Sequence, residues 1–292
     1  MKPGPKHFTL LTPPLLFLLF LVVLPLGITL VYSFLTPQTY GGVLWEFSTS
    51  AYRQFFFEQD YDGKLEFTSA YLQIFLRSFI LASFTSVLCF ILGFPTAYFM
   101  TTRSRNQRNF WLFLITIPFL SNLLIRTYAW MLILRDEGLI NEGLKWLGWI
   151  DHPLPLLYTP WAVGVGLLYS YLPFMVLPIY ANLERLDFRF LEASYDLYAS
   201  KWETLKRVIL PLSYPGIVAG CILVFIPSLG SFLAPDLLGG GKHLMIGNLI
   251  QLQFSLSRNW PFGSAISMIL FVFVIVAFVI YKKTTGASDD RQ

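Results

Sequence analysis

Long hydrophobic stretches without charge dominate this chain, and each is long enough to cross a bilayer as a helix. Five stretches lack Asp, Glu, Lys and Arg altogether: 7–45, 78–102, 152–183, 208–235 and 259–281. A sixth, 109–134, is interrupted only by Arg126. A hydrocarbon core needs about 20 apolar helical residues, and backbone groups in lipid must pair within their own segment. The pattern therefore predicts an all-α membrane protein with six transmembrane helices, at 10–35, 71–101, 110–134, 156–182, 211–235 and 261–281.

Composition and the distribution of charge support this picture and add an orientation. Of the 292 residues, 55% are hydrophobic and 13% are charged, against about a quarter charged in globular domains. Of the 21 Lys and Arg residues, 13 lie in the two terminal segments and in 102–109 and 183–210, and 6 lie in the other loops. Cytoplasmic loops carry the excess of cations. We expect a multi-pass membrane protein with both termini cytoplasmic, in contact with lipid and not with nucleic acid.

The sequence lacks the motifs of an enzyme or a metal site. The nearest approach to a phosphate-binding loop is GGGK at 239–242, but Asp236 and His243 stand where that motif requires Gly and Ser or Thr. Three His and two Cys residues lie far apart along the chain. We therefore expect no catalytic residue, no metal site and no cofactor. If the protein uses energy, another chain supplies it.

The cytoplasmic loop 183–210 carries an amphipathic helical pattern. Apolar residues recur at spacings of three and four: Leu183, Leu186, Phe190, Ala193 and Leu197. A second face carries Arg185, Arg189, Glu192 and Asp196. Such a helix can be a solvated connector, an interfacial helix or a helix inserted into a partner's groove. An interfacial helix usually has a cationic polar face, so the mixture of two acids and two arginines favours a protein partner.

Within this loop, Glu192-Ala193-Ser194, Tyr198 and Leu210-Pro211 resemble the E-A-A-x3-G-x9-I-x-L-P signature of bacterial ABC importer permeases. Ser194 replaces the second Ala, and Tyr198 replaces the Gly that permits a sharp turn. The resemblance implies that 183–210 is a coupling loop whose helix docks on a cytoplasmic ATPase. The implied coupling residues are Glu192, Ala193, Ser194, Asp196, Tyr198, Leu210 and Pro211.

Five further segments resemble the permease subunits of bacterial spermidine/putrescine importers. They are LIRTYAW (124–130), YLPFMVLPIY (171–180), PDLLGG (235–240), MIGNLI (245–250) and NWPFGSA (259–265). The resemblance implies a type I ABC importer permease architecture in the bacterial inner membrane, with residues 1–292 as one permease domain. It also implies three partners: a second homologous permease, a homodimeric cytoplasmic ATPase that binds ATP-Mg, and a periplasmic polyamine-binding protein.

A polyamine is a flexible polycation, so its pathway should offer carboxylates and aromatic faces. Asp236, expected at the outer end of the fifth span, is either a pathway residue or a helix-terminal residue. Pathway and packing roles are both open for the aromatic residues Tyr128, Trp130, Tyr169, Tyr171 and Phe174. Arg126 would repel the cargo, so it either pairs with a carboxylate or carbonyl, reaches outward, or acts as an electrostatic gate.

Other functions remain open at this stage. The chain could be an ABC permease for an opine, ferric iron or an anion, or a membrane assembly subunit that transports nothing. A secondary transporter would need ionisable relays inside its spans, and only Arg126 lies deep within one. The outer loops hold 10 of the 17 acidic residues against 6 cations, which favours a cationic cargo. The outer loop 36–70 contains both acidic and aromatic residues. They could dock the binding protein, attract cations by electrostatic steering, or simply belong to a solvated loop.

Overall fold

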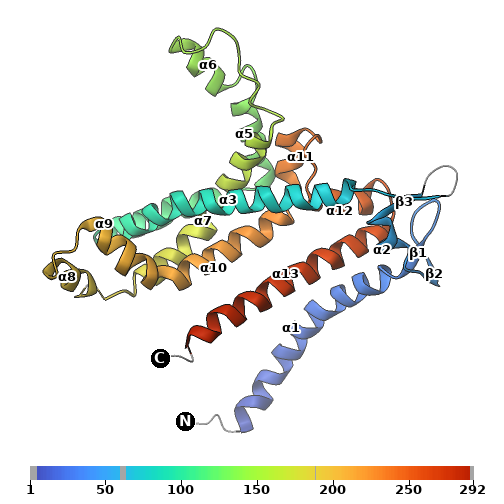
Figure 1. The fold of residues 1–292 in the computed structure, drawn as a ribbon, viewed down its shortest axis with the longest axis horizontal. Helices are drawn as coiled ribbons and strands as arrows, with labels where there is room; N and C mark the ends of the chain where they lie inside the picture. The colour runs from blue at the N-terminus through green and yellow to red at the C-terminus, as the bar shows by residue number, and fades with distance from the viewer. Residues whose placement is uncertain (1–4, 60–63, 188, 290–292) are drawn as a thin grey trace. The chain divides into compact units, whose positions relative to one another are not determined.

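The computed structural model describes residues 5–59, 64–187 and 189–289, which form helices and two short hairpins (Figure 1). The terminal cations Lys2 and Arg291 and the acids Asp60 and Asp62 lie outside these residues. The chain divides into two compact units. One consists of Met1–Gln73 and Leu249–Gln292, and the other of Ile74–Asn248.

The first unit pairs the two ends of the chain. Helix α1 (Pro5–Tyr32) packs along α13 (Trp260–Asp289), and the rings of Tyr32 and Trp260 stack with their centroids 6.2 Å apart (Figure 1). From residue 16 to 24, every side chain of α1 is exposed within this chain. Such an apolar surface is typical of a helix that faces lipid or another membrane subunit.

The loop 36–70 is more regular than its sequence suggests. Strands β1 (Leu35–Pro37) and β2 (Val43–Phe47) form one antiparallel hairpin, and β3 (Phe57–Gln59) and β4 (Leu65–Phe67) form another. The short helix α2 (Ser50–Gln54) lies between them in the chain and packs on α13.

The second unit is built on the pair α7 (Pro160–Leu183) and α10 (Leu210–Leu229), with most of α3 (Ala70–Thr101) beside them. Its core centres on Met175, Val176 and Ile179 of α7, which are fully buried. The remaining elements are α4 (Arg105–Leu120), α5 (Leu123–Leu134), α6 (Leu139–Trp146), α8 (Arg189–Asp196), α9 (Lys201–Thr204), the π-helical turn η1 (Leu205–Ile209) and α11 (Leu233–Gly239). Helix α12 (Ile246–Ser255) begins at the end of this unit.

Small residues let α7 and α10 approach closely. A Cβ added to Gly216 would lie 2.6 Å from Asn182 Cβ and 2.9 Å from the Pro178 carbonyl oxygen. A Cβ added to Gly220 would lie 2.8 Å from Met175 Sδ. These contacts explain the small residues spaced four apart at 216–220, because close helix packing in a membrane requires them.

The third expected span, 110–134, is not one straight helix in the structure. Helix α4 ends at Leu120, and the chain turns by 92° before the next helical segment begins at Leu123. Asn122 caps α5 by accepting a hydrogen bond from Leu124 N–H at 2.8 Å, so the turn has its own N-cap. Within the described residues, five helices are long and apolar enough to span a membrane, or six if this bent pair is counted as one span.

The fifth span also ends earlier than predicted. Its helix runs continuously from Lys201 to Leu229 and stops at Gly230, before the expected end at 235. The chain then begins α11, which packs against α5 and α7. Asp236 therefore lies on a separate short helix rather than at the end of the span.

Candidate coupling and translocation sites

The predicted coupling loop contains a short helix with a well-formed end. Helix α8 covers Arg189–Asp196, so the predicted pattern from 183 to 197 is split after α7 ends at Leu183. At the C-terminus, Ala199 N–H donates to the Ser194 carbonyl at 3.1 Å and Tyr198 N–H donates to the Tyr195 carbonyl at 2.9 Å. These two bonds form a Schellman motif, which closes a helix through a left-handed residue.

Tyr198 is that left-handed residue. Its φ is +59°, and its side chain is 97% exposed. The sharp turn that Gly permits in the family signature is therefore formed here by a residue with a Cβ. Replacing the Gly of the signature by Tyr198 raises the conformational cost of the turn, but the left-handed geometry of the turn is still formed.

Ser194, the other departure, makes a buried contact that Ala could not make. Its hydroxyl lies 3.0 Å from the Thr204 hydroxyl of α9, and the two residues are 8% and 1% exposed. Ser194 also donates to the Leu191 carbonyl at 2.7 Å. Because its single proton is used there, the Thr204 hydroxyl is the donor between the two side chains. This pair joins α8 to the helix that continues into the fifth span.

The start of that helix is closed by a capping box. Ser200 accepts from Glu203 N–H, and the Glu203 carboxylate accepts from Ser200 N–H at 2.9 Å. The π-helical turn Leu205–Ile209 follows, and Leu210 N–H bonds to the Leu205 carbonyl, five residues back. Pro211 lacks an N–H and its ring crowds the carbonyl four residues back, so the wider turn accommodates it. Sequence analysis placed Leu210 and Pro211 in the motif but did not reveal this turn.

The outward face of α8 combines apolar and acidic side chains. Phe190, Ala193 and Leu197 of the predicted apolar face are exposed, as are Glu192 and Asp196. The inward side is instead occupied by Leu191 and Ser194. An apolar strip bordered by carboxylates is thus free on the surface of this chain.

The candidate pathway aromatics form two groups in the second unit. Trp130 and Tyr169 meet edge to face, with ring centroids 5.6 Å apart. Tyr171 and Phe174 lie 6.2 Å apart, and the Tyr171 hydroxyl donates to the Pro227 carbonyl at 3.2 Å. Tyr128 is half exposed. Trp130, Tyr169, Tyr171 and Phe174 thus have packing contacts within this chain, whereas Tyr128 has an open face.

Arg126 lies beside the second group and has unsatisfied donors. Its guanidinium interacts electrostatically with the Tyr171 phenol. Its Nε and Nη1 atoms are buried and make no hydrogen bond within the described part of the chain. The ion pair found among the described residues joins Arg108 to Glu184 at 3.1 Å. Arg126 therefore has no carboxylate partner among those residues. Sequence reasoning identified Arg126 but could not show which neighbours it lacks.

Asp236 is exposed in the first turn of α11, where its N–H bonds to the Phe232 carbonyl at 3.0 Å. Among the described residues it makes no ion pair. A carboxylate at a helix N-terminus is stabilised by the helix dipole and is here open to a cation.

These features define a class of protein: a helical membrane subunit with an exposed amphipathic helix, α8, bonded to the start of the helix that forms a span. The chain belongs to the binding-protein-dependent transport system inner membrane component family, whose model matches residues 90–283. It is therefore a multi-pass inner-membrane transport subunit that is not itself an enzyme, and the predicted ABC permease class is confirmed.

Relatives narrow the comparison. The chain is 38% identical over 285 residues to the spermidine/putrescine transport system permease protein PotB of Haemophilus influenzae. The aligned residues cover 97% of this chain and 96% of that protein. It is 44% identical over 215 residues to the protein of the same name from Escherichia coli, covering 74% and 78%. The fold resembles a chain of a bacterial alginate ABC transporter, with a TM-score of 0.74 at 15% identity, covering 96% and 93%.

Proposed function

We propose that this chain is one of two permease subunits of an ATP-driven importer of polyamines such as spermidine and putrescine. The observation that carries this proposal is its similarity to PotB of Haemophilus influenzae over nearly the full length of both proteins. The excess of acidic residues in the expected outer loops supports a polycationic cargo, because it raises the local concentration of cations.

The proposed assembly contains this chain as a single permease domain, a second homologous permease, a homodimeric cytoplasmic ATPase that holds ATP-Mg, and a periplasmic polyamine-binding protein. Both termini and the loops 102–109 and 183–210 face the cytoplasm in this arrangement, as the excess of cations there indicates.

Helix α8 couples the ATPase to the spans in this proposal. Glu192 and Asp196 accept charge-assisted hydrogen bonds from cations of the ATPase, and Ala193 permits close approach. Ser194, Tyr198, Leu210 and Pro211 hold α8 to the helix Lys201–Leu229. The Ser194–Thr204 bond and the continuity of that helix support this route, because a displacement of α8 then moves the fifth span.

The pathway proposal includes Asp236, Tyr128, Trp130, Tyr169, Tyr171 and Phe174. Asp236 and Tyr128 are exposed and are offered as direct contacts for ammonium groups, through charge and cation–π attraction. The other four pack in pairs and are offered as the wall beside them.

Reconstitution in proteoliposomes with the three partner proteins tests the function. Spermidine or putrescine with its binding protein should stimulate ATP hydrolysis and accumulate inside, and omission of this chain should abolish both. Asp236→Asn should slow polyamine uptake while leaving the assembled complex intact. Stimulation by an anion or a ferric complex in place of polyamines would overturn the assignment of cargo.

A further inference from the structure

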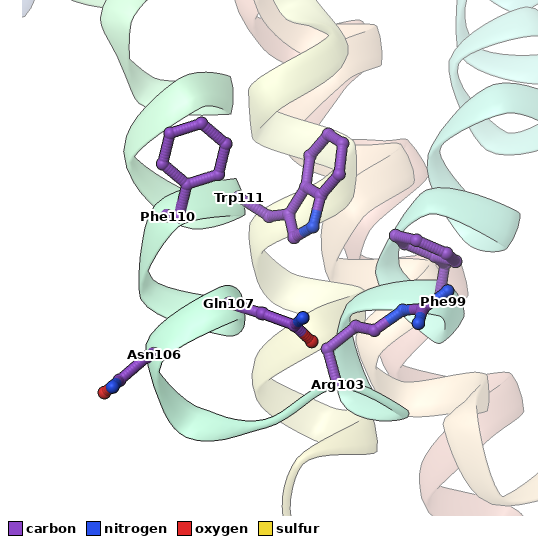
Figure 2. A pocket seen from close by; sticks show the side chains of 6 residues that line it. All are labelled: Phe99, Arg103, Asn106, Gln107, Phe110 and Trp111. Atoms are coloured by element: carbon purple, nitrogen blue, oxygen red, sulfur yellow. The ribbon is translucent and has the colours of Figure 1, made fainter.

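A groove at the junction of α3 and α4 has no role in the transport proposal. It has a volume of about 500 Å³ and is lined by Phe99, Arg103, Asn106, Gln107, Phe110 and Trp111. Figure 2 shows Phe99 and Arg103 coming from α3 and the following turn, and Gln107 and Trp111 pointing toward them from α4, whereas Asn106 points away. The groove thus has a polar end near Arg103 and an aromatic end near Trp111.

The polar end is positively charged and open. The segment 102–109 contains three arginines and no acid. Arg108 is neutralised by Glu184 at 3.1 Å, whereas Arg103 makes no ion pair within the described residues and lies 4.2 Å above the Phe99 ring. The N-terminus of α4 adds to the positive potential through the helix dipole, and its first turn holds no acidic residue that would neutralise it. Arg103 and the Gln107 amide offer donors that suit a phosphate group.

The aromatic end continues into an apolar track. Phe99 and Trp111 meet edge to face at 5.6 Å, and Phe110 lies 6.0 Å from Trp111. Along α4, Phe110 and Phe113 are 59% and 61% exposed, and Leu114 and Ile117 follow on the same side. Helix α4 buries none of its residues within this chain. Exposed apolar residues at helical spacing give a path along which an acyl chain can lie.

We propose that this groove binds an anionic glycerophospholipid, with its phosphate at Arg103 and Gln107 and one acyl chain along Phe110, Leu114 and Ile117. Basic pockets between transmembrane helices on the cytoplasmic side bind acidic headgroups in this way. The groove presents a cationic end beside an apolar track, and these match the charged head and the apolar tail of a lipid. This match favours a lipid over a protein partner. The placement in the cytoplasmic leaflet rests on the topology proposed above and does not depend on the cargo.

Native mass spectrometry of the full-length chain in detergent, with any copurifying partners, tests this site. Dioleoylphosphatidylglycerol should be retained in preference to dioleoylphosphatidylcholine. Arg103→Gln should weaken retention of the anionic lipid about fivefold, since one cation near the membrane surface is worth about 1 kcal/mol. Arg105→Gln is the matched control, because it removes the same charge from the same segment but does not line the groove. Equal losses from both variants, or equal retention of both lipids, would overturn the proposal.

A photoreactive amino acid at position 107 gives a second, independent measurement in native membranes. Cross-links to phospholipid are expected. Cross-links mainly to the ATPase or to another permease would show that a protein covers the groove and would overturn the lipid assignment. Neither result depends on polyamine transport, so a failure here leaves the proposed function untouched.

Discussion

At the residue scale, the end of helix α8 depends on Tyr198, whose φ of +59° is unfavourable for a side chain with a Cβ. The left-handed conformation costs roughly 1–2 kcal/mol for such residues. The turn persists because two backbone hydrogen bonds close it and because the phenol extends into solvent, where it meets no steric conflict.

Tyr198→Gly should therefore raise the stability of the protein by about 1 kcal/mol, since Gly adopts the same conformation without strain. The thermal unfolding midpoint of the purified protein in detergent measures this change. Leu197→Gly is the control: Leu197 has a negative φ, so the substitution should lower stability. A fall in the midpoint for Tyr198→Gly would show that the phenol itself stabilises the fold.

The Ser194–Thr204 pair is the second prediction at this scale. Ser194→Ala restores the residue of the family signature but leaves the buried Thr204 hydroxyl without its acceptor, at a cost of about 1–3 kcal/mol. Thr204→Val should cost less when Ser194 is already Ala, because the two changes remove the same bond. Unfolding midpoints of the two single variants and the double variant provide the cycle, and strictly additive losses would contradict the contact.

At the element scale, hydrophobicity predicts where helices lie better than where they bend. The six spans were found from charge-free length, and the helices observed overlap each of them. The bend at Ser121 and the end of the fifth span at Gly230 both fall inside uncharged sequence, so they leave no mark on a hydropathy pattern. Two residues near the bend do indicate it. Pro118 disfavours a continuing helix, and Asn122 can cap a new one.

The coupling site shows a similar limit. The signature located α8, and spacing predicted an apolar face that includes Phe190, Ala193 and Leu197, but it did not show that all three are exposed in this chain. The inward contact is made by Ser194, whose partner Thr204 lies ten residues away on the next helix. Such a pairing depends on the turn between two helices, which helical periodicity does not describe.

Gly216→Ala is the prediction for the contact between α7 and α10. Its added methyl would meet the Pro178 carbonyl at 2.9 Å and Asn182 Cβ at 2.6 Å, so the helices must separate, at a cost of about 1–3 kcal/mol. Gly164→Ala is the control, because the nearest atom to its added Cβ is Phe84 Cε1 at 3.9 Å. Thermal unfolding should separate the two variants, and equal midpoints would contradict close packing at Gly216.

At the scale of the whole molecule, the proposed role is to transmit motion, since the sequence reveals no source of energy in this chain. The described residues place two exposed carboxylates on α8, a buried hydroxyl pair at its inward side, and one helix running from Lys201 to Leu229. In the proposed orientation, a force applied to α8 from the cytoplasm would reach the core of the second unit through these contacts. The proposed route therefore needs an ATPase that grips the face containing Glu192.

Glu192→Arg tests this route directly. An exposed carboxylate contributes little to the fold of its own chain, so the variant should insert into the membrane and unfold at an unchanged temperature. Reversing its charge should weaken association with the ATPase by tenfold or more, since a charge-assisted bond is worth about 1.5–3 kcal/mol. Copurification of the ATPase and ATP-dependent uptake should both fall. Glu142→Arg makes the same change on α6, on the expected outer side, and should leave ATPase binding intact. Normal ATPase binding by Glu192→Arg would remove this carboxylate from the contact, and the force would have to enter through another part of the loop.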